Sequence, residues 1–136
     1  MPRFIAALAF AALALAACGG GSDGSEQGQS GEPGVVEGFR VLKTIEIHET
    51  DFAFEPSTIR VGEIAIYGLK IVNDGDVAHS FEISGPKLHR KIGAIQPGES
   101  TTIAVFFRER GDYDFICPID DHAEMGMQGV ITVGPR

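Results

Sequence analysis

Short segments of alternating polarity, separated by turn signals, fill the chain from residue 39 to its end and constrain the fold more than any other feature. Residues 43–49 and 101–107 alternate apolar and polar side chains, as half-buried strands do. Further candidate strands cover residues 58–61, 64–72, 77–84, 113–117 and 130–133. Gly, Pro, Asn and Asp mark the gaps, and no segment has a convincing helical period. The pattern predicts an all-β fold, an antiparallel sandwich or barrel of about seven to eight strands.

The composition limits the number of domains and excludes one class of partner. The chain has 136 residues, enough for one ordinary domain, and 43% of them are hydrophobic, so a core can form. Nineteen acidic side chains against eleven Lys and Arg give a formal net charge of −8. Because nucleic-acid binding depends on basic side chains that neutralise phosphates, we expect no nucleic-acid partner.

The chain begins with an apolar segment, residues 4–17, that follows a single positive charge. It is shorter than the roughly 20 residues that span a bilayer, and it fits a secretory signal peptide. The segment runs into Leu-Ala-Ala-Cys-Gly at residues 15–19, which resembles a bacterial lipobox, where the signal is cut before the cysteine and the thiol receives a lipid. We therefore predict a signal peptide at 1–17 and lipidation of Cys18. An ordinary signal peptide with a chance cysteine is the alternative.

Residues 18–38 are predicted to be the lipidated cysteine and a flexible tether. Eight Gly and three Ser lie within residues 19–38, which leaves too little apolar surface to offset the entropy of ordering. A coil of this length typically reaches about 25 Å. The globular domain is then expected at residues 39–136, outside the cytoplasm on the periplasmic or outer cell-surface side, and held at a membrane without spanning it. With Cys18 blocked, no disulfide is expected.

The unusual chemistry of the sequence lies near its end. Cys117 ends a candidate strand on its inward face, since side chains alternate along a strand. His122 and Met127 follow at intervals of five residues in a segment without strand character, and His79 at the start of another candidate strand is the remaining candidate ligand. Two imidazoles, one thiolate and one weak axial thioether form the ligand set of a blue-copper electron-transfer site. Sulfur favours Cu(I) and nitrogen supports Cu(II), so the set suits both oxidation states.

These motifs resemble the cupredoxin family of blue type 1 copper proteins. The segment His-Ser-Phe-Glu-Ile at 79–83 and the spacing Cys117-x4-His122-x4-Met127-x-Gly are similar to its auracyanin, azurin and plastocyanin-like members. The resemblance implies an eight-stranded Greek-key sandwich, one type 1 copper ion, and one-electron transfer between redox partner proteins. It also implies that the backbone N–H of Ser80 bonds the cysteine sulfur and tunes the site.

Two features depart from the family pattern. Many relatives have Pro-Gly before the loop histidine, whereas Asp120 and Asp121 precede His122 here. Solvated carboxylates at this position would lower the potential somewhat and favour a partner with a basic docking face. The second departure is Met125, an alternative axial ligand three residues after His122. We prefer Met127, because the residues around it resemble the family's axial segment.

Several functions compete on the sequence alone. The leading hypothesis is a membrane-tethered, monomeric copper protein that carries single electrons outside the cytoplasm. A copper carrier, or a lipoprotein that buffers copper, would use the same ligands but release the ion. Catalysis is not expected: a dinuclear copper centre needs a second cysteine in the loop, and Cys117 with His122 lacks an orienting third group. A metal-free adhesion sandwich would leave the Cys-His-Met segment unexplained.

Overall fold

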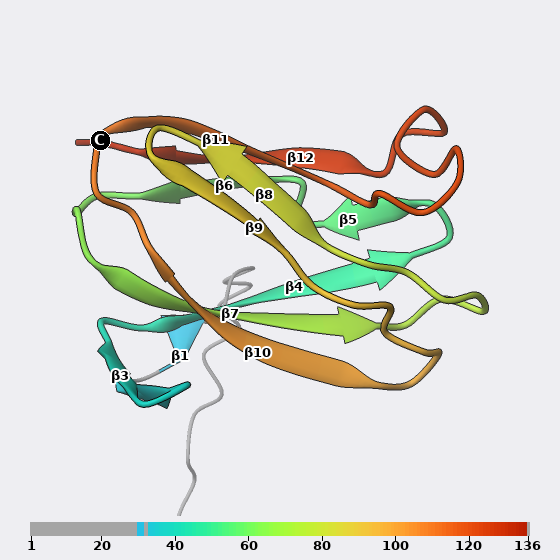
Figure 1. Cartoon of the computed structure of the whole chain (residues 1–136), viewed down its shortest axis with the longest axis horizontal. Coiled ribbons are helices and arrows are strands. Elements are labelled where there is room, and N and C mark those ends of the chain that lie inside the picture. Colours follow the sequence, from blue (N-terminus) through green and yellow to red (C-terminus); the bar gives the residue numbers. More distant parts are fainter. Residues whose placement is uncertain (1–29, 32, 136) are drawn as a thin grey trace, which may run out of the picture.

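The computed structural model describes residues 30–31 and 33–135, and they form two facing β-sheets with a small strand pair at one end (Figure 1). One sheet has the order β1–β4–β7–β10, with β5 also paired to β4; its strands are β1 Ser30–Gly31, β4 Thr44–Thr50, β5 Ala53–Glu55, β7 Ile66–Asn73 and β10 Ser100–Phe106. The other has the order β6–β12–β11–β8–β9, formed by β6 Thr58–Val61, β8 Glu82–Gly85, β9 Leu88–Lys91, β11 Gly111–Ile116 and β12 Gln128–Val133. The separate pair joins β2 Gly34–Val36 to β3 Phe39–Val41.

The predicted all-β sandwich is confirmed, and its strand pairing is mixed. Most neighbouring strands within the described residues are antiparallel, as expected. Two pairs run parallel: β4 with β7, where Ile47 lies opposite Ile71, and β6 with β12, where Ile59 lies opposite Ile131. Each parallel pair joins strands that are not consecutive in the chain, because a parallel connection cannot be made by a tight hairpin.

The core lies between the two sheets and follows the alternation seen in the sequence. Along β4, every second residue is buried, so the strand turns Ile45, Ile47 and Glu49 inward. Phe54, Phe81 and Phe115 pack ring to ring, with centroids 5.1–5.8 Å apart. Burying each of these aromatic rings contributes about 1.5–3 kcal/mol, so they hold the two sheets together at the level where β11 ends.

The structure contains more strands than the sequence predicted. The additional ones are short: β1, β2, β3, β5 and β9 have two to four residues each. Such segments are too short to show a period. The expected strand at 77–84 is also reduced, because only Glu82–Gly85 joins the sheet and His79 makes an isolated bridge to Ile95.

Strand structure is present ahead of residue 39, the expected start of the globular domain. Residues 34–36, within the range predicted as tether, form β2. The next residue, Glu37, is held by the Arg90 guanidinium at 2.5 Å and by the backbone N–H of Ala104 at 2.8 Å. These charge-assisted hydrogen bonds attach the β2–β3 turn to β9 and β10.

The predicted signal peptide and Cys18 lie outside the described residues. Among the residues that the structure does describe, no helix is long and apolar enough to cross a bilayer.

Candidate metal centre

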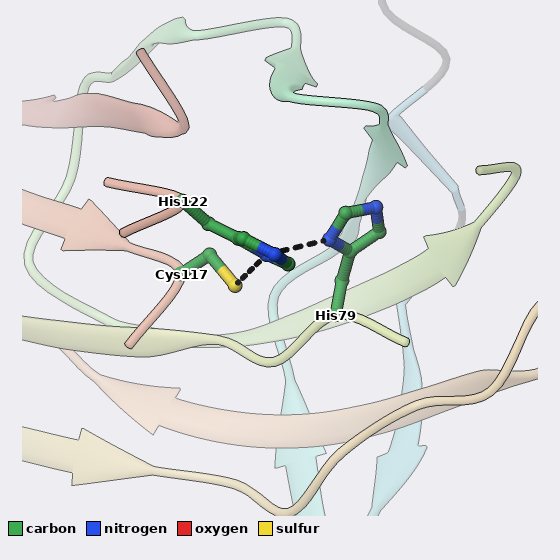
Figure 2. A group of neighbouring side chains, drawn as sticks. All are labelled: His79, Cys117 and His122. Carbon is green, nitrogen blue, oxygen red and sulfur yellow. Dashed lines mark hydrogen bonds between the residues drawn. The ribbon is translucent and has the colours of Figure 1, made fainter. Parts of the chain in front are cut away.

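Three of the predicted ligands meet at one end of the sandwich. The donor atoms of His79, Cys117 and His122 all lie within 4.8 Å of one another, and all three residues are buried. Nδ1 of His122 lies 3.3 Å from Nδ1 of His79 and 3.5 Å from the Cys117 sulfur. The dashed lines in Figure 2 mark these two contacts. Among the described residues this is the one group of three His, Cys, Asp or Glu donors close enough to share an ion.

His79 is held by the backbone of its neighbours. Its N–H donates to the carbonyl of Ile95 at 3.1 Å, and its carbonyl accepts from the Ile95 N–H at 2.7 Å. The buried Asn73 amide fixes both sides of this segment, since it donates to the carbonyls of Val77 at 2.9 Å and Ile95 at 2.8 Å. The segment after β7 is therefore rigid where it presents the imidazole.

The loop between β11 and β12 presents the other donors. Cys117 directly follows β11, and its N–H donates to the Met127 carbonyl at 3.1 Å. The Met127 N–H donates to the His122 carbonyl at 3.0 Å, so the loop curls back on itself. Gly126 has a φ of 111°, a conformation that side chains rarely adopt and that glycine permits. This closure brings residues five and ten positions apart to the same place.

The two candidate axial methionines have different surroundings. Met127 is fully buried and belongs to the hydrophobic core that also contains Cys117. Met125 is 51% exposed. The burial of Met127 beside the loop closure favours it as the thioether of the site.

Comparison with known proteins places the chain in a family. The model of the cupredoxin-like domain matches residues 7–133. The chain belongs to the cupredoxin-like family. Two solved structures show the same fold. Dithionite-reduced auracyanin from the photosynthetic bacterium Roseiflexus castenholzii is 22% identical, with a TM-score of 0.60 over 68% of this chain and 97% of the other. Auracyanin B is 20% identical, with a TM-score of 0.64 over 78% of this chain and 97% of the other. A search of curated proteins found no match.

The donors of this cupredoxin-like domain fit a copper ion. Donors about 2.0–2.3 Å from a common metal are themselves about 3–4 Å apart. The His122 donor lies 3.3 Å from that of His79 and 3.5 Å from that of Cys117, and all three donors lie within 4.8 Å of one another. One thiolate sulfur with two imidazole nitrogens is the blue-copper donor set. Family and donors together indicate a type 1 copper site in an electron carrier, not an enzyme.

In this cupredoxin-like domain, burial and hydrogen bonding shift the pKa of the Cys117 thiol in opposite directions. Burial is the main cause that raises the pKa of this thiol. The backbone N–H groups of Ile119 and Ser80 hydrogen-bond to the sulfur and lower the pKa. The Ser80 hydroxyl itself donates to the Ile92 carbonyl at 2.9 Å, so the side chain is used to hold the backbone in place. A buried thiol of this kind gives up its proton when a metal ion binds.

Three residues at the site were not found by sequence reasoning. Asp51, between β4 and β5, has Oδ1 2.7 Å from Nε2 of His79. Phe52 packs against both imidazoles, with ring centroids 5.9 Å from His79 and 4.6 Å from His122. Gly75 lies against Asp51 and His79, because a Cβ there would be 2.2 Å from Asp51 Oδ1 and 2.8 Å from His79 Nε2. No local pattern in the segment Asp51-Phe52-Ala-Phe54 shows which residues it will contact in the fold.

One buried carboxylate of the cupredoxin-like domain does not belong to the group of three donors. Glu49 is completely buried on β4, and neither of its oxygens has a hydrogen-bond partner among the described residues. Burial raises the pKa of this carboxyl to about 7. The other two histidines, His48 and His89, are paired with carboxylates at the surface, outside the metal centre.

Proposed function

We propose that this protein is a membrane-tethered type 1 copper protein that carries single electrons between redox partners outside the cytoplasm. His79, Cys117 and His122 would hold its copper ion, and the thioether of Met127 would be the fourth donor. The convergence of three buried donors on one point supports this assignment most directly. When bound, the copper ion supplies a one-electron redox centre. The protein residues hold this centre in place and shield it from water.

The protein residues orient the donors and exclude water. His79 and Cys117 have no exposed surface, whereas His122 is 8% exposed. His79 is fixed through the backbone of the segment after β7, and Cys117 and His122 are fixed by the closed loop. A preformed donor set limits rearrangement when the oxidation state changes. Because His122 is the one proposed ligand with any exposed surface, we assign the route of the electron between the site and a partner to it.

The charges beside this route fit a basic partner. Asp120, Asp121 and Glu124 are exposed on the loop that carries His122. In a chain of net charge −8 they add negative potential around the exposed edge of the site. A docking partner with a basic face would be steered to it, with an association rate that falls as salt increases.

The position in the cell follows from the sequence. Residues 1–17 would be removed as a signal peptide, Cys18 would carry the lipid, and the Gly-rich segment after it would tether the copper domain as a monomer. The distance at which the domain could then reach partners would be set by the length of chain between Cys18 and β1.

The test is a visible absorption and EPR spectrum of the mature chain, residues 18–136, loaded with copper under oxidising conditions. An intense thiolate-to-copper band with a narrow copper hyperfine splitting supports the proposal. Reversible oxidation and reduction with the ion retained identifies an electron carrier. Loss of Cu(I) to a competing chelator at each reduction would instead identify a copper carrier, and a colourless protein would exclude the type 1 site.

A further inference from the structure

The side chain of Asp51 joins two parts of the site that are far apart in the sequence. Its Oδ1 lies 2.7 Å from Nε2 of His79, 28 residues further along the chain. Its Oδ2 accepts the backbone N–H of Asp76 at 2.7 Å. Both oxygens are therefore used, one by the ligand and one by the turn before it.

The hydrogen-bond directions fix the tautomer of the imidazole. A backbone N–H can only donate, and an ionised carboxylate can only accept. Nε2 of His79 must therefore carry its hydrogen toward Asp51. The lone pair then lies on Nδ1, the nitrogen that faces His122 in Figure 2.

Gly75 provides the space for this contact. A Cβ at this position would be 2.2 Å from Asp51 Oδ1 and 2.8 Å from His79 Nε2, closer than such atoms approach. Its backbone N–H donates to the Asn73 side chain at 2.8 Å, which keeps the turn tight. Any side chain here would push the carboxylate and the imidazole apart.

We infer that Asp51 is a positioning residue that presents Nδ1 of His79 to the metal and lowers the reduction potential of the site, with Gly75 as the residue that makes the contact possible. The inference rests on the proposed copper function. A carboxylate that accepts the second N–H of a ligating histidine fixes the ring and raises its basicity. A more basic imidazole favours the more positive ion, Cu(II), over Cu(I).

Two substitutions of different chemistry test the inference. Asp51→Asn leaves one amide oxygen for two donors, so either His79 or Asp76 loses its bond. Gly75→Ala removes no charge but separates the same two groups. The matched control is Asp74→Asn, which removes one charge from the same turn; its side chain is 51% exposed and paired with His48.

The expected result is a common effect of the first two variants that the control lacks. Their Cu(II) affinity should fall about 10- to 100-fold, the range typical for loss of such a partner. Each tenfold loss not matched in Cu(I) raises the potential by about 59 mV. If Asp51→Asn and Gly75→Ala keep the potential and affinity of the Asp74→Asn control, the inference is wrong.

A metal-free measurement separates this inference from the proposed function. Nitrogen-15 NMR of the mature chain without copper reports which ring nitrogen of His79 carries the hydrogen. We expect hydrogen on Nε2 in the wild type and in Asp74→Asn, and a mixture of tautomers in Asp51→Asn. A wild type with hydrogen on Nδ1 would overturn the role of Asp51, whatever the protein does with copper. Absence of the copper–thiolate band in the wild type would instead overturn the proposed function.

Discussion

At the scale of single residues, a substitution of Cys117 should have the most direct effect on the absorption spectrum of the copper-loaded protein. The intense visible band needs a bond between copper and the thiolate, so Cys117→Ser should abolish it. Serine is slightly smaller than cysteine, and the metal-free fold should persist with a loss of about 1–3 kcal/mol for burying a hydroxyl. Absorption spectra with and without added copper, alongside thermal unfolding, would check both parts. An intense band that survives the substitution would refute the ligand assignment.

The axial position is tested by a pair of methionine substitutions. Met127→Leu conserves volume in the core and should cost less than about 1.5 kcal/mol. It should leave a coloured site with a raised potential, because the axial donor tunes the potential. Met125→Leu, at the half-exposed position, should change the potential little. Voltammetry on both variants measures their reduction potentials. A larger change of potential in Met125→Leu than in Met127→Leu would assign Met125 as the axial ligand instead.

Glu49 should make the stability of the metal-free protein depend on pH. Its pKa is about 7 in the fold, against an ordinary value of 4.5. Between these two pH values the folded state holds a proton that the unfolded chain has lost. The free energy of unfolding should therefore fall as pH rises through this window, by on the order of 3 kcal/mol, and level off above it.

Urea unfolding of the metal-free chain at a series of pH values from below 4.5 to above 7 measures this dependence. Glu49→Gln cannot ionise and should flatten it. An identical pH slope in the wild type and in Glu49→Gln would show that another group is responsible.

At the scale of strands, sequence patterns located the elements with clear alternation or long apolar runs. β4, β6, β7, β10, β11 and β12 all lie within or close to predicted segments. β9 was not predicted, because its residues Leu-His-Arg-Lys resemble a charged surface cluster; pairing with β8 holds it in the sheet. β2 was not predicted, because its Gly-Val-Val sequence follows a run of Gly and Ser. In both cases the partner strand, and not the local sequence, decides the structure.

The metal centre could be predicted where its donors follow one another at a recognisable spacing in the sequence, as Cys117, His122 and Met127 do. Cys117 and His122 lie close together in the sequence, and His79 could be linked to them by the chemistry of its side chain alone. Asp51 could not, because its contact with His79 depends on how the turn after β4 sits beside the turn after β7. The parallel β4–β7 register, with Glu49 opposite Asn73, brings those two turns together.

The close packing of β12 against β11 gives a prediction at this scale. A Cβ on Gly129 would be 2.3 Å from the Phe115 ring and 2.4 Å from the Ser57 carbonyl. Gly129→Ala should therefore displace the ring and destabilise the fold by about 1–3 kcal/mol. Gly93→Ala is the control, since nothing lies within 4 Å of the added carbon. Denaturant unfolding of both variants measures the difference; equal midpoints would mean that the strand pair adjusts freely.

At the scale of the whole molecule, the proposed lipid on Cys18 determines where the copper domain is found. Cys18→Ala removes the acceptor thiol, so the protein should leave the membrane fraction while the domain keeps its copper spectrum. Fractionation of cells that express either form checks this. Retention of the Cys18→Ala protein at the membrane, with its signal peptide removed, would contradict lipid anchoring.

The long connections in this sandwich have a consequence for the order of events as the chain folds. His79 and His122 are 43 residues apart, and the β6–β12 pair joins residue 58 to residue 130. Contacts so distant in sequence form slowly and late. The donors that would hold a copper ion therefore come together only after both sheets have formed. A copper ion that bound the native state and not the unfolded chain would add about 1.4 kcal/mol to the free energy of unfolding for each tenfold excess over its dissociation constant.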